Sequence, residues 1–149
     1  MRILIINGPN INLLGLREPH IYGATTYEEL IHDLGTYIEQ QQATPSFYQS
    51  NHEGDIVDRI QAALLQENLK ADAIIINPAA YTHTSVAILD ALKAVQLPTV
   101  EVHISNPKER ETFRHYSYVS EYAEKTIMGE GLKGYYMAVD YLIQNNTHV

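Results

Sequence analysis

Continuous apolar runs alternate with amphipathic segments along the whole chain. Three runs rich in β-branched residues, each bounded by polar or proline-containing turns, predict buried strands at residues 2–6, 73–76 and 99–104. Two weaker runs, at residues 46–50 and 126–128, predict shorter strands. Between the runs, apolar residues recur with the period of an α-helix. This period predicts helices over residues 26–41, 55–69, 85–95 and 132–143, and a short helix over 109–114.

The alternation of strands and helices predicts the fold class. Strands that are apolar throughout, rather than at every second position, are typical of a parallel sheet covered by helices on both faces. Right-handed crossovers then favour a doubly wound arrangement. We therefore expect residues 1–149 to form one α/β domain, a flavodoxin-like five-stranded parallel sheet with strand order 2-1-3-4-5.

Polar side chains follow the predicted strands, and the fold class predicts that they gather at one edge of the sheet. In open parallel sheets, ligands bind beyond the carboxyl ends of the strands, beside the first strand. The candidates follow the first, third and fourth strands; they are Asn7, Asn10, Arg17, Tyr22, Asn77, Tyr81, His83, His103, Ser105 and Asn106. The sequence therefore predicts a polar site at one edge of the sheet.

Composition and charge narrow the classes of partner. The chain has no cysteine, which removes disulfides and thiol chemistry. The net charge of -8 argues against nucleic acid, whose binding depends on a basic surface. No apolar run approaches the roughly 20 residues that span a bilayer, and the apolar start is too short for a signal peptide. We expect a cytoplasmic protein that does not contact membranes.

A small anion remains a possible ligand because a few cations are clustered. Lys108, Arg110 and Arg114 lie close together in the sequence, and Arg17 stands alone in the first loop. The alternative is that the cluster is a solvated helix face.

Arg17 and Tyr22 form the first candidate pair for catalysis. An ordinary tyrosine needs about 4 kcal/mol to ionise at pH 7. A guanidinium about 4 Å away supplies about that much at an effective dielectric near 20. Tyr22 could therefore act as a base if Arg17 is close and partly desolvated. The alternative is a tyrosine whose ring packs under the loop.

Glu101 and His103 form the second candidate pair. Residues two apart on a strand point to the same face, so the carboxylate can orient the imidazole and favour its protonated form. This arrangement suits a general acid. The alternative is a partly buried histidine satisfied by a hydrogen bond. Asn77 and His83 likewise could contact a ligand or belong only to the turn after the third strand.

The segment 129–134 has the spacing G-x-G-x-x-G. It precedes the last predicted helix, so no following strand can present the acidic residue of a dinucleotide site. We interpret it as a tight strand-to-helix turn. A non-catalytic module that binds flavin or nucleotide is the alternative function that the fold and this glycine run keep open.

Taken together, these segments resemble the type II 3-dehydroquinate dehydratases from end to end. The matching segments include the asparagine-, arginine- and tyrosine-containing loop, the turn after the third strand and the Glu-Val-His strand; they are residues 7–15, 17–19, 22–23, 49–54, 77–78, 81–85 and 101–106. Single matching positions follow at Arg110, Glu111, Phe113, Arg114, Ser117, Ser120, Gly129, Gly131, Gly134 and Tyr135. Several long motifs in one order are more specific than any single pair above.

The resemblance implies an anti elimination of water from 3-dehydroquinate that gives 3-dehydroshikimate through an enolate, in the shikimate or quinate pathway. It implies that Tyr22 removes the proton next to the ketone and that Arg17 favours tyrosinate. His103, oriented by Glu101, would protonate the departing hydroxyl, and Asn10 would hold water near the enolate. No cofactor and no metal are implied.

The resemblance also implies binding residues and an assembly. The positions that match substrate-binding residues are Asn77, His83, Asp90, Ile104, Ser105 and Arg114. Asp90 matches a position that reaches a neighbouring subunit's site, and family members form dodecamers built of trimers. The chain departs from the family at Ala79, where glycine is usual, and at Glu121 and Lys125, which precede the last predicted strand.

Overall fold

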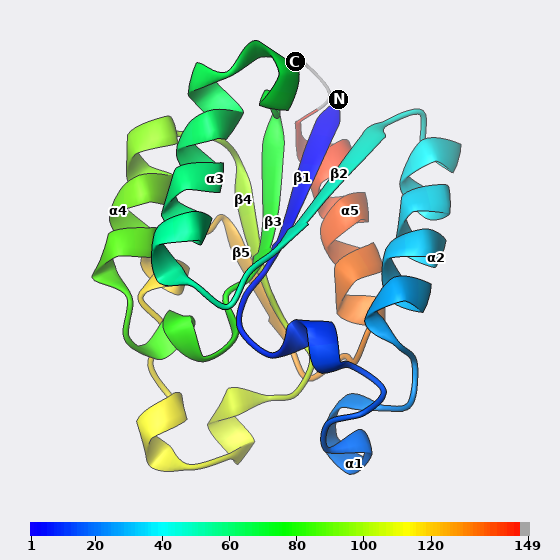
Figure 1. The fold of residues 1–149 in the computed structure, drawn as a ribbon, viewed down its shortest axis with the longest axis vertical. Helices are drawn as coiled ribbons and strands as arrows, with labels where there is room; N and C mark the ends of the chain where they lie inside the picture. Colours follow the sequence, from blue (N-terminus) through cyan, green and yellow to red (C-terminus); the bar gives the residue numbers. More distant parts are fainter. Residues whose placement is uncertain (147–149) are drawn as a thin grey trace.

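The computed structural model describes residues 1–146 and places one parallel sheet between two layers of helices (Figure 1). The strands are β1 (Arg2–Asn7), β2 (Thr44–Gln49), β3 (Ala73–Asn77), β4 (Thr99–His103) and β5 (Lys125–Met128). They pair in parallel in the order β2-β1-β3-β4-β5. The predicted flavodoxin-like fold and its strand order are confirmed.

Helices cover both faces of the sheet. They are α1 (Pro19–Tyr22), α2 (Tyr27–Gln40), α3 (Glu53–Leu65), α4 (Val86–Val95) and α5 (Lys133–Asn145). In Figure 1, α2 and α5 lie on one face and α3 and α4 on the other. Successive strand residues point to opposite faces, so Ile3 and Ile5 join the core under α2 and α5, whereas Leu4 and Ile6 join the core under α3 and α4. None of the helices within residues 1–146 has the length and apolar character needed to cross a membrane.

Three predicted elements differ from the observed ones. The predicted helix over 55–69 ends at Leu65, and a separate 3-10 turn follows because the chain must return to β3, where the Ala71 N–H donates to the Ala63 carbonyl. The predicted helix over 109–114 is two 3-10 turns, Pro107–Glu109 and Thr112–Arg114, separated by extended backbone at Arg110. Strand β2 starts two residues earlier than predicted, since an edge strand tolerates Pro45.

The ends of β1 and β3 approach closely at the carboxyl edge of the sheet. Asn7 and Asn77 are paired in register, and the next amide, that of Gly8, donates to the Asn77 carbonyl at 2.7 Å. A Cβ at Gly8 would lie 2.4 Å from the Pro78 carbonyl oxygen, so only glycine fits there. The predicted convergence of polar residues after these strands thus depends on a glycine.

Tyr135 of α5 contacts the same two strand ends from the face of the sheet that α2 and α5 cover. Its side chain is fully buried, and its hydroxyl donates to Asn7 Oδ1 at 2.5 Å and accepts from Asn77 Nδ2 at 2.9 Å. Burial raises the pKa of Tyr135 above its ordinary value, so the phenol stays neutral and keeps its hydrogen for Asn7.

This network predicts a stability effect. Tyr135→Phe keeps the ring but leaves the Asn7 oxygen and the Asn77 amide without their buried partner, so it should lower the free energy of unfolding by about 1–3 kcal/mol. Urea unfolding at neutral pH measures this. The matched control is Tyr136→Phe on the same helix, which preserves the edge-on packing against Tyr37 and should change stability by less than about 0.5 kcal/mol. Equal stabilities of the two variants would contradict the role given to the Tyr135 hydroxyl.

Candidate functional site

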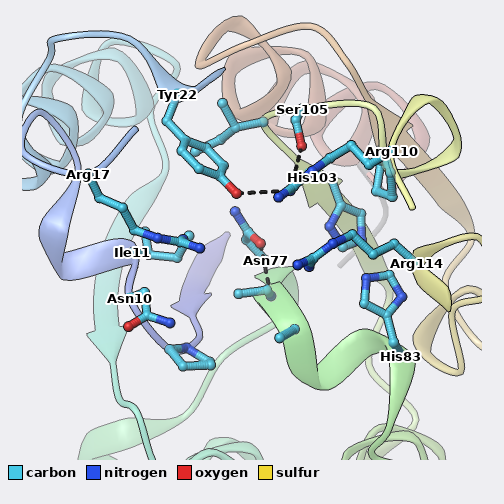
Figure 2. Close-up of a pocket in the computed structure, with 15 residues that line it drawn as sticks. Asn10, Ile11, Arg17, Tyr22, Asn77, His83, His103, Ser105, Arg110 and Arg114 are labelled. Carbon is cyan, nitrogen blue, oxygen red and sulfur yellow. Dashed lines mark hydrogen bonds between the residues drawn. The ribbon is translucent and has the colours of Figure 1, made fainter. Parts of the chain in front are cut away.

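A cleft opens at the carboxyl edge of the sheet, where β1, β3 and β4 end (Figure 2). The lining comes from the loops after these three strands and comprises Pro9, Asn10, Ile11, Arg17, Tyr22, Asn77, Ala79, Ala80, His83, His103, Ile104, Ser105, Pro107, Arg110 and Arg114. Three of these residues are arginines, and none of the described lining residues is an aspartate or glutamate. The cleft is therefore cationic in a protein whose net charge is -8.

Tyr22 ends the short helix α1 and projects into the cleft between two guanidinium groups (Figure 2). Arg110 Nη1 donates a hydrogen bond to the Tyr22 hydroxyl at 2.9 Å. The Arg17 guanidinium carbon lies 5.1 Å from the centre of the Tyr22 ring, and that of Arg110 lies 5.8 Å from it. Two cations therefore lie beside the Tyr22 side chain.

The predicted pair of Arg17 and Tyr22 is therefore close in space, but the hydroxyl contact comes from Arg110. Arg17 lies over the ring and also pairs with Glu18 at 3.6 Å. In the sequence, Arg110 belongs to a cluster of cations whose pattern gives it no role in the site. That cluster was the available signal, yet 88 residues separate Arg110 from Tyr22, and only the fold brings them together.

His103 and Glu101 lie on the face of β4 that α4 covers, as their spacing predicts. His103 Nε2 is 2.6 Å from Glu101 Oε1, and neither side chain is appreciably exposed. Because a carboxylate can only accept, Nε2 carries the hydrogen of this bond. Nδ1 is then the ring nitrogen that can exchange a proton with a ligand in the cleft.

The Glu101 carboxylate is held in its ionised form. Burial by itself would raise the pKa of Glu101, but hydrogen bonds from His103, Ser117 and Ser120 outweigh it and lower the pKa to about 2. An ionised Glu101 in turn stabilises positive charge on the adjacent imidazole. The pair is therefore suited to delivering a proton from His103.

Three further predicted residues present polar atoms at the cleft. Asn77 uses its Oδ1 for the Ala79 amide at 3.1 Å and one Nδ2 hydrogen for Tyr135, which leaves one amide hydrogen for a ligand. His83 Nδ1 lies 2.8 Å from the Tyr116 carbonyl, so Nδ1 donates and Nε2 remains an acceptor. Burial lowers the pKa of His83, which favours this neutral form. Asn10 has left-handed backbone (φ 70°).

The loop after β4 supplies the remaining predicted contacts. Ile104, Ser105 and Arg114 line the cleft, and the Ser105 hydroxyl lies 3.4 Å from Arg110 Nη1. Arg114 Nε donates to Glu111 at 2.7 Å, which leaves the outer guanidinium nitrogens for a ligand. Asp90 is exposed on α4 and does not line this cleft. Its reach into a neighbouring subunit stays a prediction.

The glycine run is the tight turn that its position predicted. It joins β5 to α5, with positive φ at Gly129 and Gly131. The Gly131 amide donates to the Ile104 carbonyl at 3.1 Å, so the turn supports the cleft loop from behind. Among residues 1–146, no group of three or more histidine, aspartate or glutamate side chains is arranged to hold a metal ion.

Of the three departures noted in the sequence, only Ala79 lies at the cleft. Ala79 has left-handed backbone (φ 52°), a conformation that costs a residue with a Cβ about 1–2 kcal/mol. Its amide donates to Asn77, and its methyl group lines the cleft. Glu121 instead accepts a hydrogen bond from the Tyr116 hydroxyl, and Lys125 lies over the Tyr141 ring.

Comparison with known proteins gives consistent results. The sequence model described as Dehydroquinase class II matches residues 1–143. The chain is 54% identical over 143 residues to catabolic 3-dehydroquinase 1 of Fusarium vanettenii, with 96% of each covered. It is 53% identical to catabolic 3-dehydroquinase of Emericella nidulans, covering 96% of this chain and 91% of that protein.

Solved structures agree with the sequence relatives. The type II dehydroquinase of Butyrivibrio crossotus superposes with a TM-score of 0.91 at 50% identity, covering 95% of this chain and 97% of that one. The type II dehydroquinase of Propionibacterium acnes superposes with a TM-score of 0.88 at 41% identity, and 97% of each chain is covered.

The depressed pKa of Glu101 predicts a pH dependence of stability. A carboxylate whose pKa falls from about 4.5 to about 2 on folding stabilises the folded state above pH 4.5, and this contribution disappears as the pH falls toward 2. The contribution is about 3 kcal/mol. Urea unfolding of the wild type and Glu101→Gln at pH 6 and pH 3 should show a smaller difference between the two proteins at pH 3. Two stability curves that fall in parallel would rule out this contribution.

Proposed function

Because the chain belongs to the class II dehydroquinase family, we propose that it converts 3-dehydroquinate to 3-dehydroshikimate by anti elimination of water through an enolate. The observation that carries the proposal is the placement of a tyrosine flanked by guanidiniums and a carboxylate-bound histidine in one cleft. The reaction needs a base for a proton next to a ketone and an acid for the departing hydroxyl. The cleft supplies one of each.

The charge of the cleft supports an anionic substrate. Arg17, Arg110 and Arg114 line it without a carboxylate among the described lining residues, so a small carboxylate is attracted against the overall charge of the protein. We place the substrate carboxylate at the Ile104–Ser105 backbone, near Arg114. His83 then accepts from a substrate hydroxyl through Nε2, because its Nδ1 is used by Tyr116.

Tyr22 is the proposed base. In its ionised form, the phenol oxygen takes the proton next to the ketone, and the C–H electron pair forms the enolate. Ionisation of an ordinary tyrosine at pH 7 costs about 4 kcal/mol. Arg110 donates a hydrogen bond to the Tyr22 hydroxyl, and Arg17 lies over the ring, so these two cations are placed to offset part of that cost.

His103 is the proposed acid. The enolate re-forms the ketone as the carbon–oxygen bond to the β-hydroxyl breaks, and the Nδ1 proton of His103 completes the departing water. Glu101 holds the ring by its other nitrogen throughout. Asn10 and the free amide hydrogen of Asn77 are placed to hold a water or hydroxyl beside the enolate oxygen. The mechanism uses no cofactor and no metal.

The remaining expectations form part of the same proposal. We propose that one catalytic domain carries the activity, that the protein is cytoplasmic, and that its product serves the shikimate pathway of aromatic amino acid synthesis or the quinate pathway. Twelve chains would assemble as trimers into a dodecamer, with Asp90 of one chain reaching a neighbouring site. The exposure of Asp90 on α4, away from its own cleft, is consistent with that role.

A direct assay tests the activity. Purified protein mixed with 3-dehydroquinate should produce the ultraviolet absorbance of the conjugated enone of 3-dehydroshikimate. A folded protein that yields no absorbance change would overturn the proposal.

Substitutions test the two proton-transfer roles. Tyr22→Phe and His103→Ala should each lower kcat by about 10²–10⁴-fold, the usual contribution of a positioned acid or base, while the fold survives. Tyr141→Phe on the far end of α5 is the matched control and should retain wild-type kcat. Turnover near the wild-type level in either of the first two variants would reject the role of that residue.

Sedimentation tests the assembly. We expect a dodecamer in solution, and a particle no larger than one chain would exclude it. Asp90→Ala should leave the assembly intact but raise KM, because the residue contacts substrate only across the interface. An unchanged KM in the assembled variant would remove Asp90 from the site.

A further inference from the structure

Four hydroxyl groups converge on the buried Glu101 carboxylate from four separate segments. Thr82 Oγ1 and Ser117 Oγ each lie 2.6 Å from Oε1, and Thr126 Oγ1 lies 3.2 Å from Oε2. Ser120 also donates to Oε2. We call these four residues the hydroxyl cage. The segments are the turn after β3, the loop preceding the 3-10 turn Val119–Glu121, that turn itself, and β5.

The hydroxyl cage exceeds what orienting His103 requires. One carboxylate oxygen, Oε1, already accepts the Nε2 hydrogen of His103 at 2.6 Å. Ser117 Oγ accepts the Ser120 amide at 3.2 Å, and the Ser117 and Thr82 hydroxyls lie 2.5 Å apart, so one of them can donate to the other while that other donates to Oε1. The two hydroxyls at Oε2 do not touch the imidazole at all. These two hydroxyls therefore act on the charge of the Glu101 carboxylate rather than on the placement of the His103 ring.

The position of one proton decides whether His103 can act as an acid. If the Nε2 proton moved across the 2.6 Å contact to Glu101, the ring would be neutral with hydrogen only on Nδ1. A neutral imidazole is a far weaker acid than an imidazolium. Hydrogen bonds donated to a carboxylate favour its ionised form, so they keep this proton on the ring.

The charges around His103 favour transfer of this proton to Glu101. The groups that share its cleft are Arg17, Arg110, Arg114, His83 and Tyr22. The three guanidiniums oppose positive charge on the imidazole, and burial opposes negative charge on Glu101. Both effects favour the neutral pair, in which the carboxyl holds the proton. The hydroxyl cage acts in the opposite direction, because hydrogen bonds donated to Glu101 favour its ionised form.

We propose that Thr82, Ser117, Ser120 and Thr126 are positioning residues that keep the acid proton on His103 by holding Glu101 ionised. This inference rests on the proposed function for its consequence in catalysis. The ionisation of Glu101 itself can be measured in the protein without substrate and without turnover.

The experiment removes the two hydroxyls at Oε2 and leaves the His103 contact at Oε1 in place. The test variant combines Ser120→Ala with Thr126→Val. The control is Thr99→Val, which deletes a buried hydroxyl two residues from Glu101 on the same strand, where it bonds the Leu97 carbonyl instead. Ser120→Thr with Thr126→Ser restores both hydroxyls. Thr126→Val alone serves if the double variant does not fold.

Two measurements decide the proposal. The carbon-13 chemical shift of the Glu101 carboxyl, followed against pH, should titrate near 2 in the wild type and at least about one pH unit higher in the test variant. The kcat of the test variant should fall about tenfold or more, since hydrogen bonds to a charged group are lost, while KM changes less than about threefold. The control and the restored variant should match the wild type in both.

The outcomes separate the two proposals. An unchanged Glu101 titration, an unchanged kcat, or an equal effect of Thr99→Val would overturn the role of the hydroxyl cage. Absence of turnover in the wild type would overturn the proposed function instead, and the carboxyl titration would still decide whether the hydroxyls hold Glu101 ionised.

Discussion

A fully buried carboxylate places a strict demand on the segments around it, because an ionised group away from water must be surrounded by donors. Glu101 meets this demand with His103 and hydroxyls from the turn after β3, from the segment that precedes β5 and from β5 itself. These contacts fix the loops on one side of the cleft relative to the sheet. The placement of His103 depends on them, and so does the side of the cleft that β4 forms.

The other side of the cleft is fixed by neutral hydrogen bonds. Asn7 and Asn77 end the neighbouring strands β1 and β3, and the buried Tyr135 hydroxyl joins their amides. The glycine after β1 permits the close approach that this requires. A charged network on the β4 side and a neutral network on the β1 and β3 side therefore hold the two halves of one site.

Local charge within the cleft runs against the charge of the whole protein. A net charge of -8 would repel a small anion at long range, but three arginines line the cleft from loops after β1 and β4. At short range and with partial exclusion of water, these cations outweigh distant carboxylates that solvent and salt screen. Two of these arginines lie beside Tyr22, the proposed base, and all three share the cleft with His103, the proposed acid. His103 in turn is hydrogen-bonded to a buried carboxylate that further hydrogen bonds hold in its ionised form.

Much of this arrangement was readable in the sequence because it follows from local periodicity. Apolar runs predicted the strands, their alternation with helices predicted the fold class and its strand order, and the spacing of Glu101 and His103 predicted a shared face. The long predicted helix that ends at Leu65 was wrong because apolar periodicity does not report where a chain must turn back to the next strand. The predicted short helix over 109–114 was wrong for a related reason. This segment lines the cleft, and its backbone breaks into two 3-10 turns there.

The sequence by itself determined the fold class and the edge of the sheet that carries the site. It also identified Tyr22 and His103 as the candidate proton-transfer residues of that site. Only the tertiary structure decided their partners. Arg110 reaches Tyr22 across 88 residues of sequence, and Tyr135 reaches Asn77 across 58. The hydroxyls around Glu101 come from segments with no shared pattern. Such contacts depend on how elements that are distant in the sequence pack together. Local periodicity does not predict which of their side chains will meet.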